Sequence, residues 1–135
     1  MPAGYSGTPL AKKLGVKTGQ RTWRLNMPAS VAVEIAQDGA APTLLSTPQP
    51  GLDMAHIFVT RRTDLAEHLA QLRKLLTPDG ILWASWPKKS AKVETDINED
   101  VIRAEALLLG LVDIKVCAVD AVWSGLKLVI RKSER

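Results

Sequence analysis

The chain has 135 residues, of which 46% are hydrophobic, and it carries a formal net charge of +4 at pH 7. This length suits one compact domain with a real core and is too short for two ordinary domains. The basic residues are scattered rather than massed, so nucleic acid is not an expected partner. A single cysteine, Cys117, excludes an internal disulfide, and neither a signal-peptide core nor a membrane-spanning apolar run is present. We therefore expect residues 1–135 to form a single domain of the reducing cytoplasm that does not contact a membrane.

The amino-terminal segment predicts a short helix. Within TPLAKKLG (8–15), Thr8 can cap a helix, a proline suits its first position and a glycine can end it. Leu10 and Leu14 are four residues apart and therefore share one face of that helix. We expect residues 1–15 to fold over the domain as a capping segment that buries both leucines.

One strand and one helix are predicted next. A strand is expected over 21–26 after a glycine turn, and a helix over 28–37 (PASVAVEIAQ) with proline in its first turn. The stretch 40–51 contains three prolines, which allow a brief strand but no long element.

From residue 52 onward, strand and helix signals alternate more clearly. A short apolar strand is expected over 55–59, and Asp64 with Glu67 can form a capping box for a leucine-rich helix. The segment 81–86 (ILWASW) is apolar on both faces, which is typical of a central parallel strand covered by helices on both sides.

The carboxy-terminal third predicts a helix and two strands. Asp96 with Glu99 can cap a helix over 97–109, and strands are expected over 113–119 and 126–131. Only a short turn at Trp-Ser-Gly separates these strands, so they should be antiparallel, because a parallel return needs a longer crossover. The predicted fold is an α/β layered domain with a mostly parallel sheet and an antiparallel strand pair at its carboxy-terminal end.

This order of elements, followed through "TPDGILWASW" to the final strand pair, resembles the Rossmann-like S-adenosylmethionine-dependent methyltransferases. That resemblance implies a methyltransferase-like domain with a reversed strand beside the last parallel one. The stretches "GYSGTPLAKKLG", "SWPKK" and "VCAVDAVWSGLKLV" also resemble a family of small bacterial proteins known only as a domain of unknown function.

The resemblance to the methyltransferases implies a glycine-rich turn after the first strand and an acidic residue at the end of the second. The corresponding stretches are 25–29 (LNMPA), which has no glycine, and 45–47 (LST), which has no carboxylate. We therefore predict no cofactor and favour a non-catalytic binding or regulatory module. The alternatives are an S-adenosylmethionine-dependent methyltransferase with a divergent cofactor site and a structural subunit of a protein complex.

Most residues capable of chemistry have simpler explanations. Cys117 lies within an apolar strand, and His56 and His68 lack neighbouring ligands, so structural or surface roles are expected and no metal site is predicted. The acidic group at 96–100 is explained by helix capping.

The predicted functional edge lies where the parallel strands end, because ligands of open parallel sheets bind there. Lysine and arginine at this edge suit a phosphate or carboxylate, so the expected partners are a small anionic metabolite or nucleotide, with a protein partner as the other possibility. Two tryptophans near the edge can wall a pocket. The predicted ligand-binding residues are Asn26, Thr60, Arg61, Arg62, Trp86, Lys88, Lys89 and Trp123.

Overall fold

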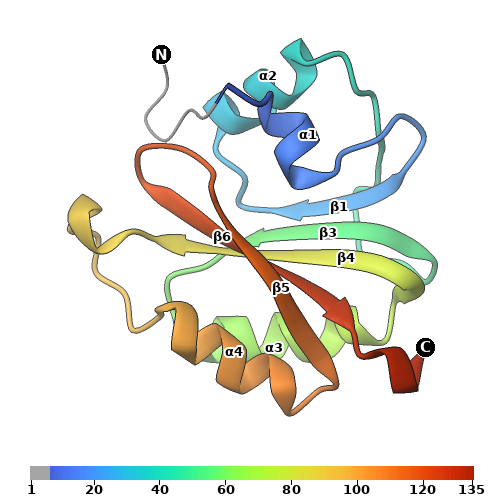
Figure 1. The fold of residues 1–135 in the computed structure, drawn as a ribbon, viewed down its shortest axis with the longest axis vertical. Helices are drawn as coiled ribbons and strands as arrows, with labels where there is room; N and C mark the ends of the chain where they lie inside the picture. Colours follow the sequence, from blue (N-terminus) through green and yellow to red (C-terminus); the bar gives the residue numbers. More distant parts are fainter. Residues whose placement is uncertain (1–6) are drawn as a thin grey trace.

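A computed structural model describes residues 7–135 and contains one six-stranded sheet with the strand order β2-β1-β3-β4-β6-β5 (Figure 1). Strands β1 to β4 pair in parallel, and β6 is antiparallel to both β4 and β5. The predicted α/β fold with a carboxy-terminal antiparallel pair is confirmed. The strands are β1 (Arg21–Leu25), β2 (Thr43–Leu44), β3 (Leu52–Phe58), β4 (Leu76–Pro87), β5 (Leu111–Ala118) and β6 (Trp123–Ile130).

Helices cover both faces of the sheet. Figure 1 shows α1 and α2 on one side and α3 and α4 on the other. The helices are α1 (Leu10–Leu14), α2 (Ala29–Gln37), α3 (Arg62–Arg73) and α4 (Glu99–Leu107), with short 3-10 turns η1 (Lys89–Ala91) and η2 (Lys132–Glu134). The two faces have separate buried clusters, one containing Trp83 and the other Trp86. These tryptophans therefore lie on opposite sides of the sheet, as their odd spacing along one strand predicts.

Helix α1 is bound to the centre of the sheet. Leu10 and Leu14 are buried, and the Nε1–H of Trp83 donates to the carbonyl of Leu14 at 2.7 Å. The residue that caps α1 is Pro9 rather than the predicted Thr8, because the helix begins one residue later than predicted. No side chain forms a hydrogen bond at this cap. Tyr5 and Ser6 of the predicted amino-terminal segment lie outside the described residues.

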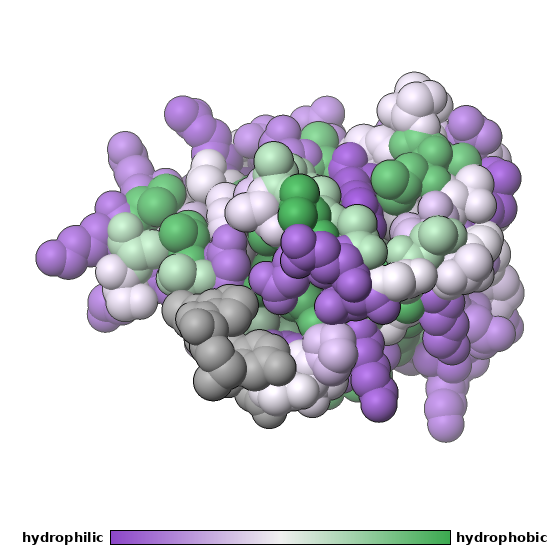
Figure 2. Space-filling view, turned by 90° about the horizontal axis from the view of Figure 1, so that it is seen from above, coloured by the Kyte–Doolittle hydropathy of each residue, from purple (hydrophilic) through white to green (hydrophobic). Residues whose placement is uncertain are grey.

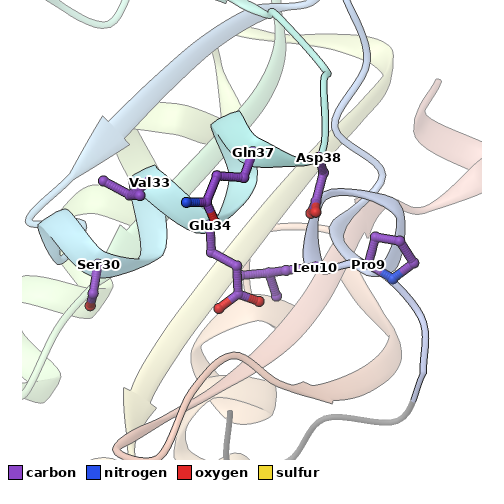
Figure 3. Close-up of a pocket in the computed structure, with 7 residues that line it drawn as sticks. All are labelled: Pro9, Leu10, Ser30, Val33, Glu34, Gln37 and Asp38. Atoms are coloured by element: carbon purple, nitrogen blue, oxygen red, sulfur yellow. The ribbon is translucent and has the colours of Figure 1, made fainter. Parts of the chain in front are cut away.

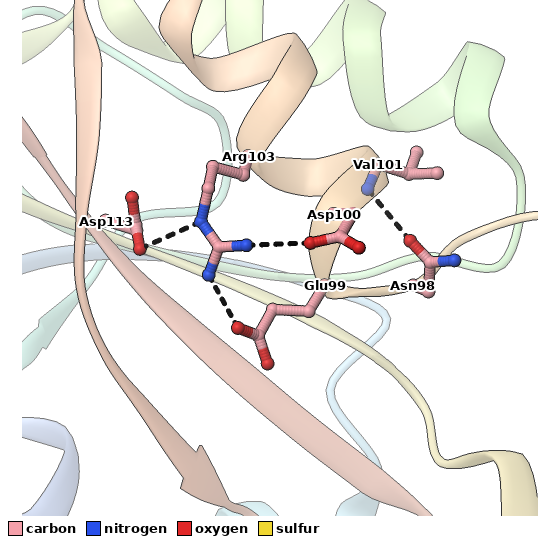
Figure 4. Close-up of polar contacts among 6 residues, drawn as sticks. All are labelled: Asn98, Glu99, Asp100, Val101, Arg103 and Asp113. Atoms are coloured by element: carbon pink, nitrogen blue, oxygen red, sulfur yellow. Dashed lines mark hydrogen bonds and ion pairs between the residues drawn. The ribbon is translucent and has the colours of Figure 1, made fainter.

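Two further predicted helix caps, those of α3 and α4, are also wrong. Helix α3 begins at Arg62, so Asp64 lies inside its first turn and is not the cap. Asp96 reaches back across the fold to accept the Arg62 N–H at 2.6 Å, which caps α3 instead of α4. The cap of α4 is Asn98, whose side chain accepts the Val101 N–H at 2.9 Å (Figure 4). The loop before α4 therefore supplies the capping side chains for both α3 and α4.

The predicted turn at residues 123–125 is part of β6. Gly125 pairs with Ser85 and Cys117 on the neighbouring strands. A Cβ atom at Gly125 would lie 3.1 Å from both Ser85 Oγ and Trp83 Cε3. The glycine is therefore needed for the close approach of β6 to β4 and not for a turn.

Candidate functional site

A cavity of about 360 Å³ opens at the edge where β1 and β3 end and β6 begins. This volume lies at the lower end of the range for small-molecule sites. Three of the predicted residues lie around it. The cavity is lined by Leu25, Asn26, Phe58, Val59, Thr60, Asp64, His68 and Trp123.

Asn26 forms a sharp turn directly after β1. Its φ angle of 56° is in the left-handed region, which asparagine adopts more readily than most residues other than glycine. Its side-chain amide donates to the Phe58 carbonyl at 3.4 Å and so connects the ends of β1 and β3. The turn that the methyltransferase resemblance assigns to glycine is made here by an asparagine, and the sequence signal for it was the asparagine that immediately follows a strand.

His68 reaches the cavity from α3, one helical turn after Asp64. Its Nδ1 is buried and has no hydrogen-bond partner among residues 7–135. The imidazole packs against Trp23, with ring centroids 6.2 Å apart and an angle of 41° between the planes. Sequence reasoning missed both Asp64 and His68 as candidate site residues, although their spacing of four on one helix places them on the same face.

An aromatic pair also lines the cavity. Phe58 and Trp123 meet edge to face, with centroids 5.2 Å apart and planes at 82°. Trp123 therefore lines the cavity, and its role in binding a ligand stays a prediction. Trp86 is buried among the core residues on the α3 and α4 side and does not line this cavity.

The predicted basic residues do not converge on this cavity. Arg61 lines a separate hollow of about 470 Å³, together with two carboxylates, Glu94 and Asp96. Arg62 forms an ion pair with Glu105 at 3.1 Å. The start of α3 is capped by the Asp96 carboxylate, so the Arg62 N–H is not free to bind an anion.

The two lysines that follow β4 differ in role. Lys88 is half-buried, and its Nζ donates to the Asp120 carbonyl at 2.7 Å. Its backbone N–H also donates to the Val122 carbonyl at 2.7 Å, so this residue ties the end of β4 to the β5–β6 turn. Lys89 is exposed at the start of η1.

Another hollow lies between the start of α1 and α2, away from the strand ends. It measures about 350 Å³ and contains the carboxylates of Glu34 and Asp38 (Figure 3). Asp38 accepts the Ala11 N–H at 2.8 Å, which explains its position as a contact between the two helices. Figure 2 shows the molecule from above relative to Figure 1. On this face, hydrophilic residues alternate with small, separate groups of hydrophobic residues.

The remaining chemically capable residues are buried within the sheet. His56 Nε2 lies 2.7 Å from Ser85 Oγ, and burial, with a contribution from the charge of Arg24, lowers the pKa of His56 to about 3. Burial also raises the pKa of the Cys117 thiol, which disfavours the reactive thiolate. These groups are consistent with structural roles.

Residues 7–135 are the part of the chain that the structure describes, and no group of three or more His, Cys, Asp or Glu side chains in this part is arranged to hold a metal ion. Nor does any helix within it have the length and apolar character needed to cross a membrane.

Solved structures with a similar fold include S-adenosylmethionine-dependent methyltransferases. A SAM-dependent methyltransferase from Aquifex aeolicus has 13% identity and a TM-score of 0.63, with 90% of this chain and 88% of that chain covered. Fibrillarin from Aeropyrum pernix, with natively bound S-adenosyl-L-methionine, has 16% identity and a TM-score of 0.51, with coverage of 89% and 73%. Mitomycin 7-O-methyltransferase MmcR has 15% identity and a TM-score of 0.64. This match covers 95% of this chain and 51% of that chain. Protein-family models and curated proteins gave no match.

These neighbours correct two predictions made from the sequence. The expectation of a non-catalytic binding or regulatory module is wrong, because the neighbours favour the methyltransferase alternative. The expectation of no cofactor is also wrong, because the neighbours include proteins solved with S-adenosyl compounds. Both predictions rested on the missing glycine after β1 and the missing carboxylate after β2, although Asn26 adopts a backbone conformation for which glycine is usually chosen. The chain has the fold of the Rossmann-like methyltransferases.

Proposed function

We propose that this protein is an S-adenosylmethionine-dependent methyltransferase with a divergent cofactor site. The observation that carries the proposal is the cavity at the carboxyl ends of β1 and β3, beside the left-handed turn at Asn26, in a methyltransferase-like fold. Open parallel sheets bind their ligands at this edge.

The residues at the edge fit the polar groups of the cofactor. The sharp turn at Asn26 brings backbone and a side-chain amide to the end of β1, where they would hold the amino-acid end. Ser46 and Thr47 follow β2, and their exposed hydroxyls would pair with the ribose hydroxyls in place of a carboxylate.

The bound cofactor would supply an electrophilic methyl group. The chain itself would contribute binding, orientation and exclusion of water. The aromatic wall of Phe58 and Trp123 is suited to excluding water, and the polar groups of Asp64 and His68 are suited to orienting a second molecule. The similarity to an O-methyltransferase among the neighbours is consistent with this assignment.

Calorimetry with S-adenosylhomocysteine tests the proposal directly, because the demethylated product binds without turnover. We expect saturable binding in the micromolar range for the wild-type protein. A folded protein that shows no saturable binding at millimolar concentrations would contradict the assignment.

Two substitutions at Asn26 separate its backbone from its side chain. Asn26→Gly removes the side-chain bond to Phe58 but keeps access to positive φ, whereas Asn26→Val makes the left-handed turn unfavourable by roughly 1–2 kcal/mol. We expect Asn26→Val to bind S-adenosylhomocysteine about tenfold more weakly than Asn26→Gly, which corresponds to a cost in that range. Equal affinities in two folded variants would show that the turn is not part of the cofactor site.

Two further expectations from the sequence are carried forward as part of this proposal. The single cysteine of the sequence, Cys117, which is free, supports a protein that works in a reducing cytoplasm. The motifs "SWPKK" and "GYSGTPLAKKLG" support membership of the small bacterial family named above.

A further inference from the structure

Another cavity lies at the amino ends of the parallel strands, at the opposite end of the sheet from the cavity proposed for the cofactor. It measures about 520 Å³, which is within the usual range for small-molecule sites. The loop between α1 and β1, the first parts of β3 and β4, and one residue of β6 form its wall. Its charged lining residues are Lys17, Asp53, Asp79 and Lys127.

These four charged side chains do not pair with one another. Every ion pair within residues 7–135 involves an arginine, and none includes a charged residue of this cavity. Asp53 accepts the Arg21 N–H at 2.9 Å through one carboxylate oxygen. Lys17 and Asp79 are exposed. Lys127 and Asp53 are half-buried, so a ligand that enters from solvent can reach charges of both signs.

The positive charges gather on the β6 side of the cavity. Lys115 lies directly opposite Lys127 in the pairing of β5 with β6, and like charges in this position repel each other. Burial lowers the pKa of Lys127, and the charges of Lys115 and Lys17 lower it further. An anionic group beside these lysines would therefore relieve a repulsion that no ion pair in residues 7–135 offsets.

The carboxylates come from other strands of the sheet. Asp53 belongs to β3, which flanks β4 on the side away from β6. Asp79 lies in the first part of β4. Neighbouring strands are about 4.8 Å apart, so the backbones of β3 and β6 are about 10 Å apart across β4. A ligand that spans this width would meet a carboxylate at one end and ammonium groups at the other.

Uncharged polar side chains also line the cavity, and they come from Thr18, Gln20 and Thr77. A threonine hydroxyl can donate or accept a hydrogen bond, which suits a peptide group with one donor and one acceptor. Ile81 is the single large apolar side chain among the lining residues, so an alkyl chain would gain little from burial here.

We propose that this cavity binds a short peptide as a zwitterion, with its terminal ammonium near Asp53 and Asp79 and its terminal carboxylate near Lys17 and Lys127. The peptide bond between the two ends would form hydrogen bonds with the polar lining. This binding site is separate from the cofactor cavity and does not depend on the proposed function.

The test measures the affinities of four matched probes by NMR titration of the backbone amides in the loop at residues 15–20. Glycylglycine is the zwitterionic peptide, valerate lacks the ammonium and n-pentylamine lacks the carboxylate. The fourth probe, δ-aminovalerate, has the same number of atoms between its charged groups as glycylglycine but no peptide bond. We expect glycylglycine to bind roughly tenfold more tightly than valerate or n-pentylamine, because each lacks one set of charge-assisted hydrogen bonds.

We also expect δ-aminovalerate to bind several-fold more weakly than glycylglycine, since it has no peptide group for the polar lining. The inference is overturned if glycylglycine binds no more tightly than valerate or n-pentylamine. It is also overturned if δ-aminovalerate binds as tightly as glycylglycine, because the peptide group would then contribute nothing.

Two double variants identify the partner of each end of the peptide. Lys17→Gln with Lys127→Gln should abolish the preference for glycylglycine over n-pentylamine and keep its preference over valerate. Asp53→Asn with Asp79→Asn should do the reverse, and the asparagine oxygen at position 53 can still accept the Arg21 N–H. Lys74→Gln with Lys132→Gln is the charge-matched control, because both lysines are exposed and outside the cavity. Thermal unfolding confirms that each variant is folded, and an equal loss of affinity in the control would overturn the inference.

Binding of S-adenosylhomocysteine to the same samples separates this inference from the proposed function. The two double variants at the cavity should bind S-adenosylhomocysteine as wild type does, because the proposed cofactor site lies at the other end of the strands. Loss of that binding in the lysine double variant would show that this cavity holds the cofactor and would overturn the inference. If wild type binds glycylglycine but not S-adenosylhomocysteine, the proposed function fails and the peptide site stands.

Discussion

Two side chains, those of His56 and Lys88, form hydrogen bonds with residues that are distant in the sequence. His56 pairs with Ser85 between the two central parallel strands, stacked on Phe58 at 4.4 Å. Lys88 directly follows β4, and its Nζ donates to the Asp120 carbonyl. Both residues contact partners about 30 positions away in the chain, so their environments follow from tertiary structure.

His56 should make the protein sensitive to acid. Its folded pKa of about 3 lies below the ordinary value of 6.5, so protons bind preferentially to the unfolded state between these two pH values. Neutral His56 makes its full contribution to the free energy of unfolding above pH 6.5. As the pH falls from 6.5 toward 3, this contribution is lost at up to roughly 1.4 kcal/mol per pH unit.

Urea unfolding at pH 7 and pH 4.5 measures this effect. The free energy of unfolding should fall more for wild type than for His56→Gln, which keeps a polar partner for Ser85 but cannot be protonated. An identical fall in both proteins would assign the acid sensitivity to other groups.

Lys88 and Lys89 offer a matched pair of substitutions. Lys88→Ala removes the donor to the Asp120 carbonyl and should lower the free energy of unfolding by about 1 kcal/mol. Lys89→Ala changes an exposed side chain and should stay within about 0.5 kcal/mol of wild type. Equal effects in chemical denaturation would show that the Lys88 bond is not significant in solution.

At the scale of elements, the loop before α4 couples two helices on the same face of the sheet. Asp96 caps α3, and Thr95 Oγ1 donates to the Thr60 carbonyl at 2.6 Å. On α4, Arg103 joins the first turn to β5 through Glu99, Asp100 and Asp113 (Figure 4). The loop and its two helices therefore form one hydrogen-bonded unit beside the cavity.

Removing the Asp96 carboxylate should loosen α3 although the residue lies outside that helix. Asp96→Ala should cost about 1 kcal/mol, as expected for a lost helix cap, and should raise amide exchange in the first turn of α3. Asp100→Ala is the control, because this carboxylate is 91% exposed and its ion pair with Arg103 is worth little. Faster exchange only in α4 would contradict the cross-capping arrangement.

At the scale of the whole molecule, α1 and the sheet share one core. Leu14 is fully buried, and its carbonyl accepts from Trp83, which belongs to the same cluster as Met54 and Phe58. The amino-terminal helix is therefore joined to the strands that carry the candidate site.

Leu14→Ala should destabilise the whole protein rather than release one helix. The expected loss is about 2–5 kcal/mol, as for other buried leucines, and tryptophan fluorescence and far-UV circular dichroism should report one common transition. Leu108→Ala serves as the control, because Leu108 is 82% exposed. Two separate transitions would show that α1 unfolds independently and would contradict a single cooperative domain.

The sequence by itself determined the order of strands and helices, because hydrophobic periodicity and turn residues act over a few positions. It also required β5 and β6 to be antiparallel, since the short connection cannot hold a crossover. Only the tertiary structure decided that Asp96 caps α3 from 34 residues away, and that His68 and Trp123 face one cavity. Hydrophobic periodicity and turn residues cannot predict such partners, because these contacts depend on how distant segments pack across the sheet.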